Sequence, residues 1–191
     1  MKEKRNALVI DVGAEKGLGA SVAARFAREG FHVFVAGRTA KSLDQVVAQI
    51  QRSGGTATAL VADATKEADV LSLFDKVCAT DGTLIFTGAS ASMRGRAGFA
   101  AFNSAKAALR NMAQAMAKEL GPKGLHVAHV VVDGGIDGER LRTRRPELVK
   151  QIGEERLVDL GGLADAYWFL HRQPQRAWSF ELDMRSNIEP W

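Results

Sequence analysis

The segment at residues 7–26 constrains the fold of this chain most strongly. It opens with a short apolar run, residues 7–10, which has the length and composition of a buried parallel strand. Three glycines follow, and then Leu18, Val22 and Phe26 recur at the four-residue spacing of a helix face. A strand, a glycine turn and a helix in this order favour a phosphate-binding site, because free N–H groups and the positive end of the helix dipole would face the anion.

The three glycines have separate expected roles in such a site. Gly13 would permit a tight turn, Gly17 would let the backbone approach a pyrophosphate, and Gly19 would let the helix pack closely on the strand. The alternative is a left-handed turn and a close helix–strand contact with no ligand. The strand–turn–helix context favours the nucleotide interpretation.

The rest of the chain alternates between strand and helix patterns. Strands are expected at residues 31–36, 56–62, 83–87, 125–132 and 178–184, and helices at 42–53, 66–79, 99–120, 146–156 and 163–170. In the helix at 66–79 the residues expected to face the core are Val70, Leu71, Phe74 and Val77. This alternation predicts an α/β fold, a parallel sheet with helices on both faces.

Length and composition favour a single domain covering residues 1–191. The one cysteine, Cys78, is expected to be a small buried hydrophobe in a helix. No stretch resembles a signal peptide or reaches membrane-spanning length, so we expect a cytoplasmic protein without a membrane partner. We expect no metal site.

The net charge of +4 permits phosphate binding without establishing it. The densest basic run consists of Arg140, Arg142, Arg144 and Arg145. A solvated helix or loop face explains this run more simply than nucleic acid does, because no nucleic-acid-binding motif accompanies it. We therefore expect no nucleic-acid partner.

The glycine spacing G-x-x-x-G-x-G resembles that of the short-chain dehydrogenase/reductase family, which usually has Thr where this chain has Val12. Asp63 after the third strand, the segment around Lys106 and the Gly134 turn follow in the family's order, so the resemblance covers nearly the whole chain. It implies a Rossmann-type three-layer sandwich with a doubly wound parallel sheet. It also implies a homo-oligomer that transfers hydride between a nicotinamide dinucleotide and a small-molecule carbonyl or secondary alcohol.

The resemblance also implies a set of cofactor contacts. Asp63 and Ala64 match residues that contact adenine, and Ile136 matches the turn that contacts the nicotinamide carboxamide, although Asp133 and Gly138 replace the usual Pro and Thr. Asp63 could instead be a helix-capping or turn acid. The full set of cofactor candidates is Gly13, Lys16, Gly17, Leu18, Gly19, Arg38, Asp63, Ala64, Lys106 and Ile136.

Charge after the second strand favours NADP(H) over NAD(H). Enzymes that prefer NAD usually place a carboxylate there, on the ribose hydroxyls. This chain has Gly37 followed by Arg38, and Lys16 lies inside the glycine loop. Two cations and no acid suit the 2′-phosphate of NADP, although both could be solvated surface residues.

The catalytic residues that the resemblance implies are a Tyr-x-x-x-Lys pair and a preceding Ser. Here Lys106 is present, but Phe102 stands at the tyrosine position and has no proton to give. The family's spacing places Ala89 at the serine position, and a one-residue change in loop length would bring Ser90 there, with Ser92 also close. Without its tyrosine partner, Lys106 is equally well explained as a cofactor contact or as a solvated helix lysine.

Family members have a further strand and a long helix where this chain passes directly from the helix at 66–79 to the strand at 83–87. One explanation is that the sequence omits a segment near residues 80–82. The other is a true deletion, with the strand at 83–87 closing against the first strand. We favour omission, because the C-terminal half otherwise resembles an intact family member. The predicted function is an NADP(H)-dependent oxidoreductase, impaired by Phe102, and the alternative is a catalytically inactive nucleotide-binding or interaction protein.

Overall fold

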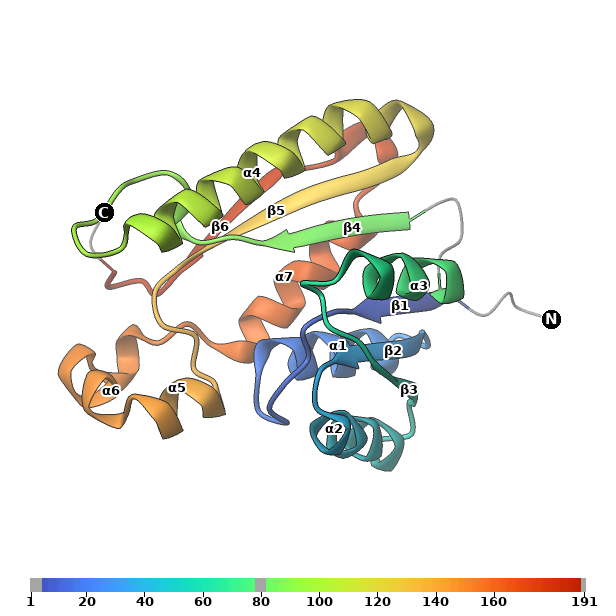
Figure 1. Cartoon of the computed structure of the whole chain (residues 1–191), viewed down its shortest axis with the longest axis horizontal. Helices are drawn as coiled ribbons and strands as arrows, with labels where there is room; N and C mark the ends of the chain where they lie inside the picture. Colours follow the sequence, from blue (N-terminus) through green and yellow to red (C-terminus); the bar gives the residue numbers. More distant parts are fainter. Residues whose placement is uncertain (1–4, 78–81, 190–191) are drawn as a thin grey trace. The chain divides into compact units, whose positions relative to one another are not determined.

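The computed structural model describes residues 5–77 and 82–189, drawn in colour in Figure 1. These residues form two compact units. The first contains the described residues up to 77 together with 137–151 and 159–168, and the second contains 82–136, 152–158 and 169–189. The predictions for Cys78 and for most of the junction at residues 80–82 concern positions outside the described residues, and the single-domain expectation stays a prediction.

The first unit is built on a parallel sheet of three strands, β1 (Asn6–Val9), β2 (His32–Gly37) and β3 (Thr56–Val61), in the order β1-β2-β3. β2 is the central strand, and Val33 and Val35 on it are completely buried. Buried β-branched residues in a central parallel strand match the apolar run seen in the sequence.

Three helices cover this sheet. α1 (Leu18–Arg28) and α2 (Ala40–Arg52) lie on one face, and α3 (Glu67–Val77) lies on the other (Figure 1). The first unit also contains α5 (Glu139–Arg144) and all but the last residue of α6 (Pro146–Ile152). The sequence pattern did not predict α5, and it is this short helix that carries most of the exposed arginine run.

The inward face of α3 differs from the prediction. Leu73 and Val77 are buried, whereas Leu71 and Phe74 are 58% and 38% exposed. Residues 70, 73 and 77 follow the three- and four-residue steps of one helix face, and this face packs toward the sheet. The prediction was right for Val77 and wrong for Leu71 and Phe74, because the apolar residues of α3 cover two adjacent faces and the predicted stripe mixed them.

The second unit is a parallel sheet of β4 (Gly82–Thr87), β5 (Leu125–Asp133) and β6 (Glu181–Arg185) in the order β4-β5-β6. The long helix α4 (Ala100–Leu120) packs on β5 (Figure 1). β5 is buried along nearly its whole length, as expected for a central parallel strand. The remaining regular elements are α7 (Leu160–Arg172) and the short 3-10 turns η1 (Ser90–Ser92), η2 (Gly121–Lys123), η3 (Glu154–Arg156) and η4 (Gln175–Ala177).

Both sheets are parallel and both follow strand–helix alternation, so the predicted α/β class is confirmed. Most predicted elements agree with the observed ones to within a few residues at each end. The largest shift affects the helix expected at 146–156, which ends four residues earlier, at Ile152, and the last strand, expected at 178–184, begins three residues later, at Glu181.

Candidate functional site

The helix α1 begins at the glycine loop with its N-terminus uncapped by any side chain. Gly17 occupies the cap position with an extended backbone, and the first turn contains no acidic residue. The first helical hydrogen bond runs from the Ser21 N–H to the Gly17 carbonyl, so the N–H groups of Leu18 and Gly19 precede it. This end of α1 therefore has the geometry and the dipole that suit an anion.

Gly19 holds α1 against the end of β1. A Cβ at this position would lie 3.2 Å from Val12 Cγ2 and 3.3 Å from Val12 Cα, which is tighter than ordinary packing. The close helix–strand approach expected from the sequence is therefore present. Gly17 is also restricted, because a Cβ there would lie 3.0 Å from the Ala14 carbonyl oxygen.

Gly13 differs from its expected role in a tight turn. Its backbone is not left-handed, and a Cβ built on it would meet nothing within 4 Å. The left-handed residue of this loop is instead Asp11, with φ of 62°, a conformation that Asp tolerates better than most residues. The turn does not require a glycine at position 13, and the open space beside Gly13 suits the approach of a ligand.

The end of β2 leaves no room for a side chain at Gly37. A Cβ on Gly37 would collide with the carbonyl oxygen of Val12, because the two segments are joined by the hydrogen bond from the Val12 N–H to the Ala36 carbonyl at 2.9 Å. Packing therefore leaves no room for an acidic side chain at the position where an NAD-preferring relative would carry one. Arg38 follows directly and is exposed.

Asp63 forms a turn at the end of β3. Its Oδ1 accepts hydrogen bonds from the Thr65 N–H at 3.1 Å and the Thr65 hydroxyl at 2.8 Å. These bonds hold the pKa of the Asp63 carboxyl below its ordinary value, and the nearby cations Arg38 and Lys66 lower it further. The structure therefore places Asp63 as a turn acid close to Arg38, with Ala64 exposed beside it.

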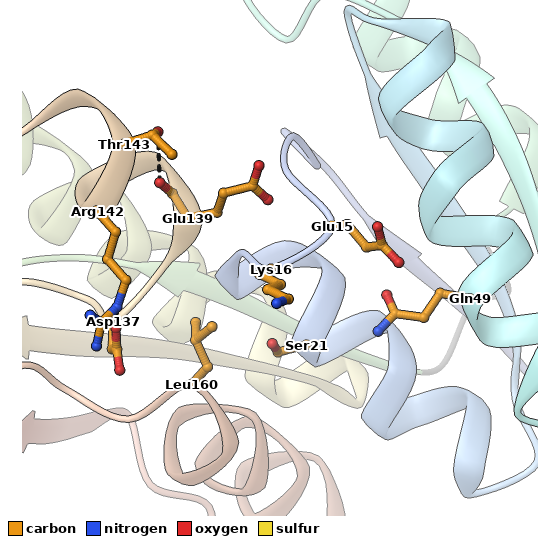
Figure 2. Close-up of a pocket in the computed structure, with 9 residues that line it drawn as sticks. All are labelled: Glu15, Lys16, Ser21, Gln49, Asp137, Glu139, Arg142, Thr143 and Leu160. Carbon is orange, nitrogen blue, oxygen red and sulfur yellow. Dashed lines mark hydrogen bonds and ion pairs between the residues drawn. The ribbon is translucent and has the colours of Figure 1, made fainter.

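A cavity of about 500 Å³ lies beside the glycine loop in the first unit. Figure 2 shows that its walls come from the loop and α1, from α2, from α5 with the residues that lead into it, and from the start of α7. The Glu139 N–H donates to the Lys16 carbonyl at 2.7 Å, which joins the start of α5 to the glycine loop. Of the cofactor candidates, Lys16 lines this cavity; the other lining residues are Glu15, Ser21, Gln49, Asp137, Glu139, Arg142, Thr143 and Leu160.

In the second unit, Lys106 and Phe102 lie one turn apart on α4. The Lys106 ammonium donates to the Thr87 carbonyl at 3.0 Å and lies 6.0 Å from the centre of the Phe102 ring. Partial burial lowers the pKa of Lys106 below its ordinary value. Phe102 is 49% exposed. Lys106 is thus held at the end of β4 rather than extending freely into solvent.

The serine candidates lie on the turn that follows β4. Ala89 caps η1, and Ser90 is the first residue of that turn, partly exposed. The Ser90 carbonyl accepts the N–H of Met93 at 2.9 Å and of Arg94 at 3.2 Å. Ser92 is buried, and its hydroxyl has no hydrogen-bond partner among the described residues. Ser90 is therefore the more exposed of the two serines.

The turn after β5 is formed by Gly134 with φ of 140°. Ile136 follows in a parallel bridge with Val158, and the Val158 N–H donates to the Gly135 carbonyl at 2.8 Å. This backbone pairing fixes Ile136 just beyond the carboxyl end of β5, where the resemblance expects a cofactor contact.

Asp133 holds this turn in a way that the sequence pattern did not reveal. It is only 4% exposed, and Arg94 donates to both of its carboxylate oxygens at 3.1 and 3.0 Å. Arg185 of β6 forms a second ion pair with it at 3.1 Å. Asp133 therefore ties the loop that carries Ser90 to the Gly134 turn. The sequence signal for this role was Asp133 itself, an acid at the position where the family usually has Pro.

The described part of the chain contains no cluster of His, Cys, Asp and Glu side chains that could hold a metal ion. It also contains no helix with the length and apolar character needed to cross a membrane.

Comparison with known proteins agrees with these features. The profile of the short chain dehydrogenase family matches residues 6–84 and 78–148. Among curated proteins, a short chain dehydrogenase/reductase from Colletotrichum higginsianum is 39% identical over 72 residues, which are 38% of this chain. A human dehydrogenase/reductase SDR family member is 34% identical over 65 residues. The matched stretches span only 27% and 21% of the length of these two relatives.

Solved structures show the same fold. A short-chain dehydrogenase from Rhodopseudomonas palustris is 31% identical, covers 95% of this chain and 99% of its own, and has a TM-score of 0.74. Actinorhodin polyketide ketoreductase with NADPH is 16% identical, covers 100% of this chain and 99% of its own, and has a TM-score of 0.81. The profile match covers well over half of the sequence, and on this ground the chain belongs to the short chain dehydrogenase family.

Proposed function

We propose that this protein binds NADP(H) in preference to NAD(H) and is an oxidoreductase acting on a carbonyl or secondary alcohol of a small molecule. The observation that carries the cofactor preference is the packing at Gly37. Because the Val12 carbonyl fills the space of a side chain there, an acid cannot be placed on the adenosine ribose from this position. Arg38 follows with an exposed guanidinium, which suits a 2′-phosphate.

The residues of the first unit fit the phosphate-bearing half of such a cofactor. The uncapped start of α1 and the open space beside Gly13 would receive the pyrophosphate. Lys16 and Arg38 would supply positive charge, and Asp63 and Ala64 would contact adenine. The NADPH named in the structure of the actinorhodin ketoreductase, which shares the fold, agrees with this choice.

In the second unit, Lys106 would hold the nicotinamide ribose and Ile136 would contact the carboxamide. The bound nicotinamide would supply or accept the hydride. Ser90 would donate a hydrogen bond to the substrate oxygen. Phe102 has no proton to transfer, so we propose a reaction slowed by roughly a hundredfold to ten-thousandfold, the usual contribution of a general acid. A positioned hydride donor still permits residual activity.

A second candidate is a catalytically inactive protein that binds the nucleotide as a sensor or serves as an interaction partner. The exposed Phe102 ring favours it, because a half-exposed aromatic residue stands where the family has its proton donor. Both candidates keep the cofactor site, so cofactor binding alone does not separate them. We also propose, from the family resemblance, that the protein is a homo-oligomer.

Thermal unfolding with each cofactor tests the binding proposal. A ligand that binds only the folded state raises the melting temperature, so NADPH should raise it more than NADH at equal concentration. Arg38→Gln should remove most of this difference, whereas Lys118→Gln, which removes an exposed cation from α4, should leave it unchanged. Equal shifts with the two cofactors in the unaltered protein would refute the preference.

Restoring the phenol separates the enzyme from the inactive protein. Phe102→Tyr should increase NADPH-dependent carbonyl reduction by at least tenfold if the remaining site is intact, because the new hydroxyl lies one helical turn from Lys106. The rate is followed by the loss of NADPH absorbance with a panel of ketones and aldehydes. Phe102→Leu is the matched control and should show no gain. A Tyr variant that binds NADPH but gains no activity would favour the inactive protein.

A further inference from the structure

A buried histidine joins three elements of the second unit. His129 of β5 is completely buried, and its Nδ1 lies 3.0 Å from Oε2 of Glu181 on β6. Arg110 of α4 donates to both oxygens of the same carboxylate, from Nε at 2.6 Å and from Nη2 at 2.8 Å. One carboxylate therefore connects α4 to β5 and β6.

The charge state of this group follows from its surroundings. The hydrogen bond from Arg110 lowers the pKa of Glu181, so the carboxylate is ionised and can only accept. Burial lowers the pKa of His129, so the imidazole is neutral at pH 7. The proton of the neutral ring must then lie on Nδ1, where it is donated to Glu181, and Nε2 carries the lone pair.

The opposite side of the imidazole faces the end of β4. A Cβ on Gly88 would overlap the His129 ring, so the ring occupies the space that a side chain at position 88 would need. The Gly88 N–H donates to the Val130 carbonyl at 2.7 Å. Gly88 is thus paired with β5 through its N–H, and the imidazole lies where its side chain would be.

The peptide between Thr87 and Gly88 holds Lys106. Its carbonyl, that of Thr87, accepts the Lys106 ammonium at 3.0 Å. Arg110 lies one helical turn beyond Lys106 on α4, so the two cations leave the helix on neighbouring positions of one face. These contacts, together with the turn of α4 between Lys106 and Arg110, therefore form a ring. It runs from Lys106 through the Thr87–Gly88 peptide, His129, Glu181 and Arg110 back along α4 to Lys106.

We infer that His129, Glu181 and Arg110 are positioning residues that fix Lys106 at the end of β4 for its contact with the nicotinamide ribose. This inference rests on the proposed function of Lys106. Stability alone does not account for the group, because Arg110 and Glu181 are partly exposed and such ion pairs contribute little. The specific consequence of the ring is the direction in which Lys106 points.

The accessibility of Lys106 in the cofactor-free protein tests the positioning directly. The test variant is Glu181→Gln, which keeps the shape of the side chain and removes its charge. The rate at which acetic anhydride modifies Lys106, followed by mass spectrometry of its peptide, should rise roughly two- to tenfold, the change that corresponds to losing one hydrogen bond. Lys118, exposed on the same helix, serves as the internal reference and should not change.

Glu119→Gln is the matched control, because it removes a carboxylate of α4 whose ion pair with Lys123 is exposed. It should leave the Lys106 rate unchanged. Arg110→Gln opens the ring at a different residue and should reproduce the effect of Glu181→Gln, and melting curves confirm that each variant is folded. An unchanged Lys106 rate in both ring variants would overturn the inference.

The affinity for NADPH, measured by fluorescence titration, provides the second readout. It should fall in both ring variants and stay constant in Glu119→Gln. A raised Lys106 rate with unaltered NADPH affinity would overturn the link to the cofactor. If the unaltered protein bound no NADPH while the Lys106 rates changed as expected, the proposed function would fail and the positioning of Lys106 by the ring would stand.

Discussion

Replacing Gly37 by Ala should destabilise the protein and disturb the glycine loop. The added methyl group would collide with the Val12 carbonyl oxygen, a backbone atom that cannot rotate away as a side chain would. Overpacking of this kind costs about 1–3 kcal/mol. For a chain of 191 residues each kcal/mol corresponds to about 2–4 °C, so the melting temperature should fall by roughly 2–12 °C.

Gly13→Ala is the matched control for that substitution. A methyl group at position 13 meets nothing within 4 Å and the backbone is not left-handed, so the variant should be as stable as the parent or more stable by about 0.4–1 kcal/mol. Its NADPH affinity should nevertheless fall, because the methyl group would occupy the space proposed for the pyrophosphate. Both quantities come from one series of melting curves, recorded with and without NADPH. The reasoning would be refuted if Gly37→Ala were as stable as Gly13→Ala.

Two further predictions concern the second unit. Burial holds the pKa of His129 below its unfolded value of about 6.5, so the unfolded chain takes up this proton first as the pH falls. The contribution of His129 to the free energy of unfolding should therefore be complete above about pH 6.5 and be lost as the pH falls through the folded pKa. Urea unfolding measured over this pH range should show a shallower decline for His129→Gln than for the unaltered protein. An unchanged slope would contradict the assignment. Asp133→Asn should lower the free energy of unfolding by roughly 1–3 kcal/mol, which is less than for a fully buried pair because Arg94 is half exposed. The control Asp183→Asn removes another partner of Arg185 and should lower it by less. Equal losses for the two variants in urea unfolding would contradict the reasoning.

The regular elements could be predicted because local pattern and tertiary environment agree along most of the chain. Val33 and Val35 belong to an apolar run that no solvated strand would carry, and they are completely buried in the central strand β2. Gly19 was identified for close packing on the strand, and Val12 lies within van der Waals reach of it. The short helix α5 lacked such a signal, since its six residues present no buried face.

The roles of individual polar residues could not be predicted in the same way, because they depend on partners distant in sequence. His129 is one of two histidines in an otherwise mainly apolar strand, and nothing nearby in the sequence indicates that Glu181, 52 residues later, accepts its hydrogen bond. Asp133 meets Arg94 from a loop 39 residues earlier. Gly37 was noted only for the acid it lacks, whereas its contact with Val12 supplies the physical reason for that lack.

The intact mass of the purified protein tests the junction near residues 80–82. The family profile matches residues 6–84 and 78–148 as two stretches that overlap at this junction. A strand and a helix of average length, with their connections, would add on the order of 2–4 kDa. We predict a mass above 20.6 kDa by this amount, because the C-terminal half otherwise resembles an intact family member. A mass of 20.6 kDa would mean that the deletion is real, and the inactive nucleotide-binding protein would then be the better interpretation, since the family's active site uses the missing helix.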